Sequence, residues 1–516
     1  IRKIQHGIDL LKLFFFSLLC VFCFVACQES SSYQSSTPTS VEPSPTKSIP
    51  QDPTPHKDEP QAYVKTTETE SDKPEILDNT SDSQTEIELI PTKNENTETQ
   101  GSTKPTPHVA SLKYIKHAKI DPPKFINKTA YKAFDDNITS KLSQIVANNF
   151  DSLTTKMGIS VAVFAGDKLW SEAKGNAYES VPLRTDQPIG IMSTSKTFIS
   201  ALILKQIEAD FYSLNDRLSD LLKGHSLYQR LDQNLFPDST VEELLLMRGG
   251  HGDKDTNSKY LNYVVSKPDW HPSDYLALTT KPGSNPGGYE YSNNSSVLLG
   301  LIAQFQSQKQ LATLYEEDLF QPLSLQIGFR PATRIPDTMA LPHANYSMYG
   351  GYGGFGDLTK MRPIGVPDWY KIDYFEQDGR LAWAGAGGFT TPENMAIWGY
   401  ELYSPKGNAL SDHNRNLILK SIIEEDIILG GVTQRYGYHI AERVHPMPDG
   451  TTIKTYGHPG GGGGYSSVLM YSPKLDISIS VLANSELGHQ RGTCDAPYMA
   501  TGLTCITYEI LSLLNS

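Results

Sequence analysis

A serine and a lysine three positions apart, Ser193 and Lys196, have the residue types and spacing for nucleophilic chemistry. The residues that follow, 197–204, are apolar around most of a helix, so we expect the pair to open a buried helix. Residues three apart lie on one helix face, which brings the lysine amine within reach of the serine hydroxyl. Burial and the positive end of the helix dipole disfavour a charged lysine, so its amine becomes able to accept a proton. The pattern therefore predicts an activated serine nucleophile.

The same spacing occurs elsewhere in the chain, and local context separates those matches from the first. Ser44 and Lys47 lie in a stretch rich in Ser, Thr and Pro, which predicts no helix. Ser171 and Lys174 lie at the end of an expected strand, where residues three apart point to opposite faces. Only the helical context favours proton transfer, so Ser193 is the candidate nucleophile.

A tyrosine and an asparagine two positions apart, Tyr291 and Asn293, form a second candidate element. A glycine turn at residues 286–288 precedes them, and an apolar helix follows. A phenol at this position can pass a proton between the serine and a leaving group if a neighbouring lysine lowers its pKa. The Asn293 amide can hold both that lysine and a substrate carbonyl. Tyr260 and Asn262 match the same pattern but lack the turn and the helix.

A run of five glycines gives the third element, within residues 457–465, between two expected strands. Such a run lets the backbone approach a ligand closely and adopt positive φ. A phosphate-binding loop is disfavoured because no Gly-Lys-Ser/Thr follows and no helix is expected here. Pro459 lacks a backbone donor, so we place it on an edge strand that borders a cleft. His458 by itself is more typical of a surface histidine, and the 13 histidines include no His-Glu-x-x-His metal pair.

The elements that must position these residues indicate an α/β (α+β) architecture. Helices are expected at residues 134–150, 197–208, 241–247, 295–304, 313–320, 392–403 and 497–514. Strands are expected at residues 159–165, 168–173, 436–444, 452–456, 465–471 and 476–482. Because the strands lie near both ends of the folded part, we expect one antiparallel sheet flanked by helices, plus a mostly helical subdomain. A cleft between these halves would hold the three elements.

In this order and context, the three elements resemble those of the serine β-lactamase and penicillin-binding protein superfamily. The resemblance is to the class C β-lactamase-like branch, which also holds D-alanyl-D-alanine carboxypeptidases, D-aminopeptidases and esterases. It covers roughly residues 125–516. Supporting stretches lie at residues 213–216, 240–245, 320–323 and 385–391. The implied fold is β-lactamase/transpeptidase-like.

The resemblance also implies a role for each residue of the first two elements. Ser193 would be the acylated nucleophile, and Lys196 and Tyr291 the proton-transfer pair. Asn293 would orient the substrate and the lysine. No metal or other cofactor is implied.

The third element would supply the substrate-binding edge of the cleft. His458 would face the cleft beside Gly460 and Gly461, and the oxyanion hole would use the backbone amides of Ser193 and Gly461. Many β-lactamases have Lys-Thr-Gly where this chain has His458-Pro459-Gly460, so a permanent cation and a hydroxyl that bind a carboxylate are missing. Histidine is mostly neutral at neutral pH.

This difference shifts the expected activity away from β-lactam hydrolysis. We expect a serine hydrolase that acts through an acyl-enzyme on an amide or ester, either D-alanyl-D-alanine carboxypeptidase-like or an esterase. The partner would be a small molecule or a peptide, including cell-wall peptide. A β-lactamase, a catalytically inactive binding protein of the same fold and a cell-wall adhesin are the alternatives.

The first residues predict export and a lipid anchor. Basic residues precede an apolar run at residues 13–26, which is too short to span a bilayer comfortably and has the layout of a secretory signal. The run ends at Cys27, followed at once by polar residues, and resembles a bacterial lipoprotein cleavage box. An ordinary signal peptide with a chance cysteine is the alternative. We expect a signal at residues 1–27, lipidation of Cys27, and a lipid-anchored protein of the cell envelope on the periplasmic or extracellular face.

Residues 28–124 predict a disordered acidic tether, and residues 125–516 the hydrolase domain. Residues 28–110 hold 15 acidic and 6 basic side chains and almost no aromatics, so they cannot build a core. Much of the net charge of -13 therefore belongs to the tether. A negative net charge argues against nucleic acid as a partner.

The cysteines leave one question open. After processing at Cys27, Cys494 and Cys505 are the cysteines left in the folded region. An oxidising compartment permits a disulfide between them, and two independent thiols are equally compatible with the sequence.

Overall fold

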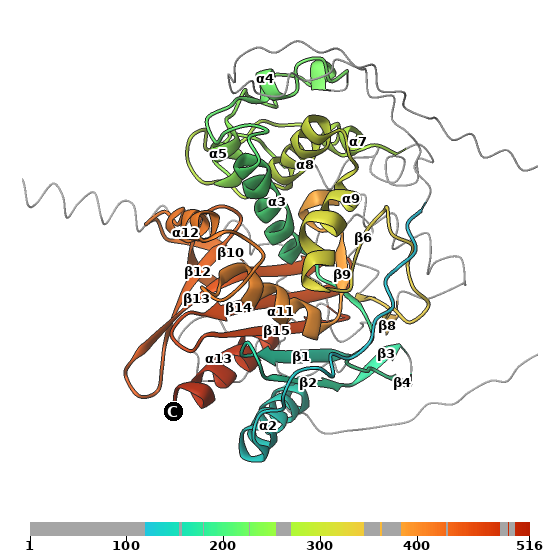
Figure 1. Ribbon diagram of the computed structural model, residues 1–516, viewed down its shortest axis with the longest axis vertical. Helices are drawn as coiled ribbons and strands as arrows, with labels where there is room; N and C mark the ends of the chain where they lie inside the picture. The colour runs from blue at the N-terminus through green and yellow to red at the C-terminus, as the bar shows by residue number, and fades with distance from the viewer. Residues whose placement is uncertain are drawn as a thin grey trace, which may run out of the picture. The chain divides into compact units, whose positions relative to one another are not determined.

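An antiparallel sheet organises the part of the chain that the computed structural model describes (Figure 1). The described residues are 119–153, 157–178, 180–226, 228–253, 270–344, 362–363, 383–429, 432–485, 494 and 501–516. The eight strands follow the order β10 (Ile427–Leu429), β11 (Val432–Tyr436), β12 (Ala441–Pro446), β13 (Thr452–Gly462), β14 (Tyr465–Ser472), β15 (Ile477–Ala483), β1 (Ile159–Phe164) and β2 (Leu169–Lys174). The first strand of the sequence thus pairs with the last one, as expected for a sheet built from both ends of the folded part.

Helices cover both faces of this sheet. The flanking helices are α2 (Asp136–Ser152), α11 (Pro392–Tyr403) and α13 (Gly502–Asn515). Alternation along β1 explains the two layers, because Val161 and Val163 pack with α2 and α13, whereas Ala162 and Phe164 join the core on the side of α11. The Phe164 ring meets Tyr400 of α11 edge to face, with the ring centroids 5.1 Å apart.

A mostly helical subdomain lies beyond the α11 side of the sheet, at the top of Figure 1. Its helices are α3 (Lys196–Glu208), α4 (Leu218–Leu221), α5 (Val241–Leu245), α7 (Pro272–Leu276), α8 (Asn293–Ser307) and α9 (Leu311–Tyr315). Local sequence explains the start of α5, where Thr240 and Glu243 form a reciprocal capping box. The fold class and the helical subdomain expected from the sequence are confirmed.

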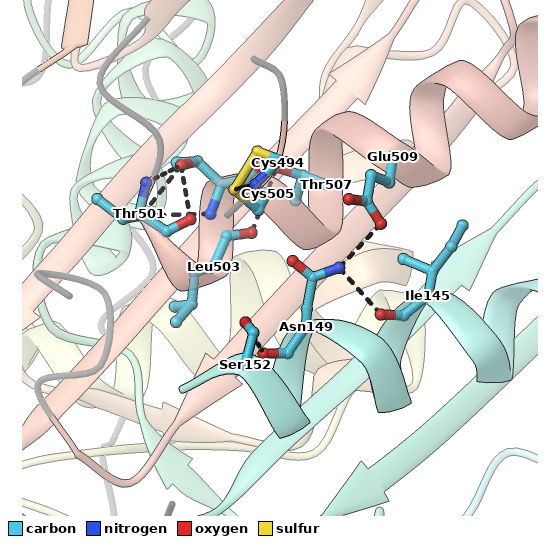
Figure 2. The surroundings of a disulfide bond; sticks show 10 residues. Ile145, Asn149, Ser152, Cys494, Thr501, Leu503, Cys505, Thr507 and Glu509 are labelled. Atoms are coloured by element: carbon cyan, nitrogen blue, oxygen red, sulfur yellow. Dashed lines mark hydrogen bonds between the residues drawn. A yellow bond between two sulfur atoms is a disulfide. The ribbon is translucent and has the colours of Figure 1, made fainter. Parts of the chain in front are cut away.

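A disulfide between Cys494 and Cys505 holds the beginning of α13 (Figure 2). Nearby, the Asn149 side chain of α2 donates to Glu509 Oε2 of α13 at 2.9 Å. The hydrogen bond joins two helices that cover the same face of the sheet, whereas the disulfide ties α13 to the chain at Cys494. Of the two possibilities that the sequence allowed, a disulfide or two independent thiols, the structure has the disulfide.

Two strand predictions need correction. The strand expected at residues 436–444 is interrupted, because the chain turns between β11 and β12, with His439 at φ 52° and a hydrogen bond from Gly437 N to Ile440 O. The strand expected at residues 452–456 continues to Gly462, so the glycine-rich element is largely strand. Among the described residues, no helix combines the length and the apolar character needed to cross a membrane.

Candidate active site

Ser193 lies in a short 3-10 helix, η1 (Met192–Ser195), that leads directly into α3. The chain enters η1 through Met192 at φ 48°, a left-handed conformation that is uncommon for residues other than glycine. Met192, Thr194 and Ser195 are buried, whereas Ser193 keeps partial exposure. The turn therefore presents the candidate nucleophile and hides its neighbours.

Hydrogen bonds to two flanking segments fix η1. On one side, Thr194 Oγ1 lies 2.7 Å from Ser467 Oγ, which donates to Ile191 O at 2.6 Å. On the other side, Ser195 Oγ accepts from Gly388 N at 3.0 Å. Gly388 begins the short strand β9 (Gly388–Thr390). The position of Ser193 is thus set by strands from separate parts of the chain.

The Lys196 side chain is fully buried and reaches the serine, as the helical spacing predicts. Its Nζ lies 3.2 Å from Ser193 Oγ, 2.6 Å from Asn293 Oδ1 and 2.9 Å from Gly385 O. The last two groups can only accept hydrogen bonds from the amine. A neutral amine can satisfy both with its hydrogens and direct its lone pair toward the serine hydroxyl. The arrangement permits proton transfer from Ser193 to Lys196.

Tyr291 lies on the other side of this amine, with Lys196 Nζ 4.9 Å from the centre of its ring. Burial raises the pKa of Tyr291 above its usual value, and a side-chain hydrogen bond to Ser193 opposes that rise. The sequence argument made proton transfer by Tyr291 conditional on a neighbouring lysine lowering this pKa. That condition is not met, because loss of water outweighs the other influences, so Tyr291 is a protonated phenol at neutral pH.

Asn293 is the first residue of α8, next to the N-cap Ser292. Its Nδ2 donates to Asp253 Oδ2 at 2.8 Å. Because a carboxylate only accepts, this contact fixes the amide nitrogen toward Asp253 and the amide oxygen toward Lys196. The Asn293 side chain is also hydrogen-bonded to Tyr275, so the amide is engaged by protein groups on both sides. Sequence reasoning missed Asp253.

The expected cleft-facing His458 is instead buried, with 1% of its surface exposed. Its Nδ1 lies 2.5 Å from Pro459 O and its Nε2 lies 2.9 Å from the Tyr436 hydroxyl. A carbonyl only accepts, so Nδ1 carries the hydrogen and the neutral ring accepts the Tyr436 proton at Nε2. Burial lowers the pKa of His458 well below its usual value. The ring is therefore neutral and engaged at both nitrogens.

The glycines of the third element form the edge of β13 beside η1. Pairing of β12 with β13 ends at Gly457, whereas pairing with β14 continues to Gly462. This leaves Pro459 with a neighbour on one side, consistent with the edge position expected from its missing donor. A Cβ on Gly460 would stand 2.3 Å from Ile191 O, closer than a side chain tolerates, and 3.0 Å from Ser193 N, so the strand packs tightly against the turn that carries the serine. Gly461 follows in the same strand, opposite Ser466.

The rival motifs do not join this site. Ser171 lies in β2 and donates to Glu393 Oε1 at 2.6 Å, as part of a strand. Tyr260 and Asn262 lie outside the described residues, as do the early Ser-x-x-Lys match at residues 44–47 and Cys27. Within the described ranges, no group of three or more His, Cys, Asp and Glu residues is arranged to hold a metal ion.

This fold and this arrangement of side chains define a class of protein. A family model described as Beta-lactamase matches residues 146–503, and the chain belongs to that family. Solved structures agree on the fold. D-amino acid amidase from Ochrobactrum anthropi SV3, solved with L-phenylalanine amide, has a TM-score of 0.57 at 17% identity, covering 74% of this chain and 99% of the amidase.

Two further solved structures share the fold at similar distance. D-stereospecific amidohydrolase from Streptomyces sp. has a TM-score of 0.50 at 18% identity, covering 68% of this chain and 95% of its own. A penicillin binding protein from Bacillus halodurans has a TM-score of 0.50 at 19% identity, covering 72% and 99% respectively. The superfamily suggested by the three sequence elements is thus confirmed.

Proposed function

We propose that the chain is a serine hydrolase that forms an acyl-enzyme at Ser193 with an amide or ester substrate. The observation that carries this proposal is the contact of 3.2 Å between Lys196 Nζ and Ser193 Oγ. The same amine donates to Asn293 Oδ1 and Gly385 O, which hold it beside the hydroxyl. A serine with an adjacent buried amine is the arrangement of an activated nucleophile.

In this mechanism the proton of Ser193 moves to Lys196 as Oγ forms a bond to the substrate carbonyl carbon. The protonated phenol of Tyr291, hydrogen-bonded to Ser193, then gives its proton to the leaving amine or alcohol as the carbonyl bond to that group breaks. The ammonium of Lys196 returns a proton to Tyr291. Water attacks the acyl-enzyme by the reverse sequence, which releases the acid and restores Ser193.

Charge stabilisation in this mechanism falls to the edge of β13. The backbone amides of Ser193 and Gly461 would receive the oxyanion, supported by the close approach of Gly460 to Ser193 N. Preorganised amide donors of this kind are worth about 10²–10³-fold in rate.

The substrate class follows from the neutral His458. Binding a substrate carboxylate favours a cation at the third element, and His458 is buried and uncharged there. An uncharged amide or ester fits this edge better than a β-lactam or a peptide with a terminal carboxylate. Because the fold neighbours include proteins named as D-amino acid amidase and D-stereospecific amidohydrolase, we propose D-amino-acid amides first and esters second.

Two measurements test this function. The purified domain is treated with a fluorophosphonate probe, and mass spectrometry locates the adduct; we expect it on Ser193 and expect Ser193→Ala to remove it without loss of fold. Turnover is then compared for D-alanine amide, L-alanine amide, a p-nitrophenyl ester and a chromogenic cephalosporin. Faster hydrolysis of the cephalosporin than of any amide or ester would contradict the proposed substrate class. Absence of labelling and of turnover would favour an inactive binding protein.

We further propose that the protein is exported and held at the cell envelope through a lipid on Cys27. The disulfide between Cys494 and Cys505 supports an oxidising compartment. Cell fractionation of a Cys27→Ser variant tests the anchor, and we expect release into the soluble fraction. Membrane association and lipid labelling equal to wild type would contradict it.

A further inference from the structure

The carboxylate of Asp253 lies behind Asn293 and accepts a hydrogen bond at each of its oxygens. Its Oδ2 accepts from Asn293 Nδ2 at 2.8 Å, and its Oδ1 accepts from the Tyr275 hydroxyl at 2.9 Å. Tyr275 belongs to α7 and is fully buried, so this anchor is rigid. A chain of contacts therefore runs from Tyr275 through Asp253 and Asn293 to the Lys196 amine.

The backbone before Asp253 is fastened to the same end of α8 that carries Asn293. Ser292 Oγ and Asn294 Nδ2 both donate to Gly252 O, at 2.7 and 2.6 Å. Ser292 and Asn294 are buried. A Cβ on Gly252 would stand 2.2 Å from Lys281 O, so this segment is also packed from the other side. The carboxylate and the amide are thus held together by their neighbours.

The orientation of the Asn293 amide decides what faces the lysine. Its two ends have nearly the same shape, so packing alone does not choose between them. In the observed orientation, an oxygen meets Lys196 and an N–H meets the carboxylate. The reversed amide would direct N–H groups at the amine hydrogens and an oxygen at the carboxylate, and both contacts would be repulsive.

We propose that Asp253 is a positioning residue, which locks the Asn293 amide with its oxygen toward Lys196 and adds a negative charge behind the proton relay. This inference rests on the proposed function. The proposal assigns a role to Asp253, which contacts neither the candidate nucleophile nor the third element in any contact described above.

The direction in which the Asp253 charge shifts the pH dependence of acylation can be predicted. Among the described residues, the titratable groups near the lysine include Tyr291, His439 and His458, and burial lowers the pKa of both histidines, so they are neutral. A carboxylate beside such a set favours the protonated forms of Lys196 and Tyr291. Removal of the charge should therefore move the rising limb of the acylation rate to lower pH.

The experiment measures the rate of fluorophosphonate labelling against pH for wild type, Asp253→Ala, Asp253→Asn and the control Asp238→Asn. We expect Asp253→Ala to slow labelling by about 10- to 100-fold, as for loss of a buried acceptor. Asp253→Asn should recover most of that rate, because its amide oxygen can still accept from Asn293, but its rising limb should stay at the lower pH. Asp238 is an exposed carboxylate that caps Ser219, and its variant should match wild type.

Three results would overturn the inference. The first is wild-type rate and pH profile in Asp253→Ala. The second is an equal loss of labelling rate in both Asp253 variants while the rising limb of the pH profile stays at its wild-type position. That result would indicate that Asp253 only supports the structure. The third can be measured even where the probe does not label the wild type, an outcome that contradicts the proposed function by itself. In protein labelled with ¹⁵N-asparagine, the side-chain signal of Asn293 is assigned by comparison with Asn293→Ala. The inference is overturned when this signal stays unchanged in Asp253→Ala. We expect that signal to move in Asp253→Ala and to stay in place in Asp238→Asn.

Discussion

Replacement of Gly460 by alanine tests the close contact between β13 and the turn that carries Ser193. A Cβ at this position would stand 2.3 Å from Ile191 O and 2.4 Å from Ser467 Oγ. Ordinary van der Waals contact begins at 3.4 Å, so β13 and η1 must separate by about 1.1 Å, the difference between 3.4 and 2.3 Å. Neither neighbour can swing aside, because Ile191 O is backbone and Ser467 Oγ is hydrogen-bonded to it at 2.6 Å.

That separation has two measurable consequences. Overpacking should lower the free energy of unfolding by about 1–3 kcal/mol. A misplacement of about 1 Å in a catalytic site can cost about 10²-fold in rate, so fluorophosphonate labelling of Ser193 should slow by about that factor. Chemical denaturation and labelling kinetics give the two quantities.

The matched control for this variant is Gly450→Ala. Gly450 lies in an exposed turn at φ 81°, and a Cβ there would meet nothing within 4 Å. We expect this variant to lose about 1–2 kcal/mol from backbone strain and to keep the wild-type labelling rate. A Gly460→Ala protein with wild-type stability and wild-type labelling would refute the argued proximity of β13 and Ser193.

Three other predictions concern the relay, the disulfide and acid stability. Lys196→Ala and Tyr291→Phe should each slow acylation by about 10²–10⁴-fold. The double variant should lose far less rate than the product of the two single losses, because the two residues act as one proton-transfer unit. Additive losses in the labelling assay would argue for separate roles. Reduction of the bridge between Cys494 and Cys505, which are 11 residues apart, should lower the free energy of unfolding by about 3 kcal/mol, measured by denaturation with and without reductant. Burial lowers the pKa of His445 to about 3, below its unfolded value, so the unfolded state binds more protons as the pH falls. Stability should fall by up to about 1.4 kcal/mol for each pH unit below about 6.5, and His445→Gln should reduce that slope in denaturation curves.

Local parts of the candidate site were predictable from the sequence, because they depend on neighbours along the chain. Ser193 and Lys196 meet through helical spacing, and Tyr291 and Asn293 lie between a turn and a helix. The surroundings of these residues were not predictable in the same way. Asp253 lies 40 residues before Asn293, and no spacing rule relates a carboxylate to an amide across such a distance.

The same limit explains the errors in the sheet and at His458. A continuous run of strand-forming residues hid the turn before β12, which depends on the left-handed conformation of His439. His458 was expected to face the cleft because the family resemblance implies that place for the first residue of the third motif. Its burial depends on Tyr436, which belongs to a different strand. The burial that raises the pKa of Tyr291 comes from packing between distant segments, so composition around the residue gave no signal for it.

The pairing of β1 with β15 also sets the time at which this protein can fold. Gly158, just before β1, donates its N–H to Asn484 Oδ1, 326 residues later in the chain. At a synthesis rate of about 5–20 residues per second, the hairpin of β1 and β2 waits about 15–65 s before its central neighbour leaves the ribosome. Native contacts between residues so far apart also make folding intrinsically slow. For a chain that is exported, as we propose for this one, that delay keeps the sheet open until the last strand has been made.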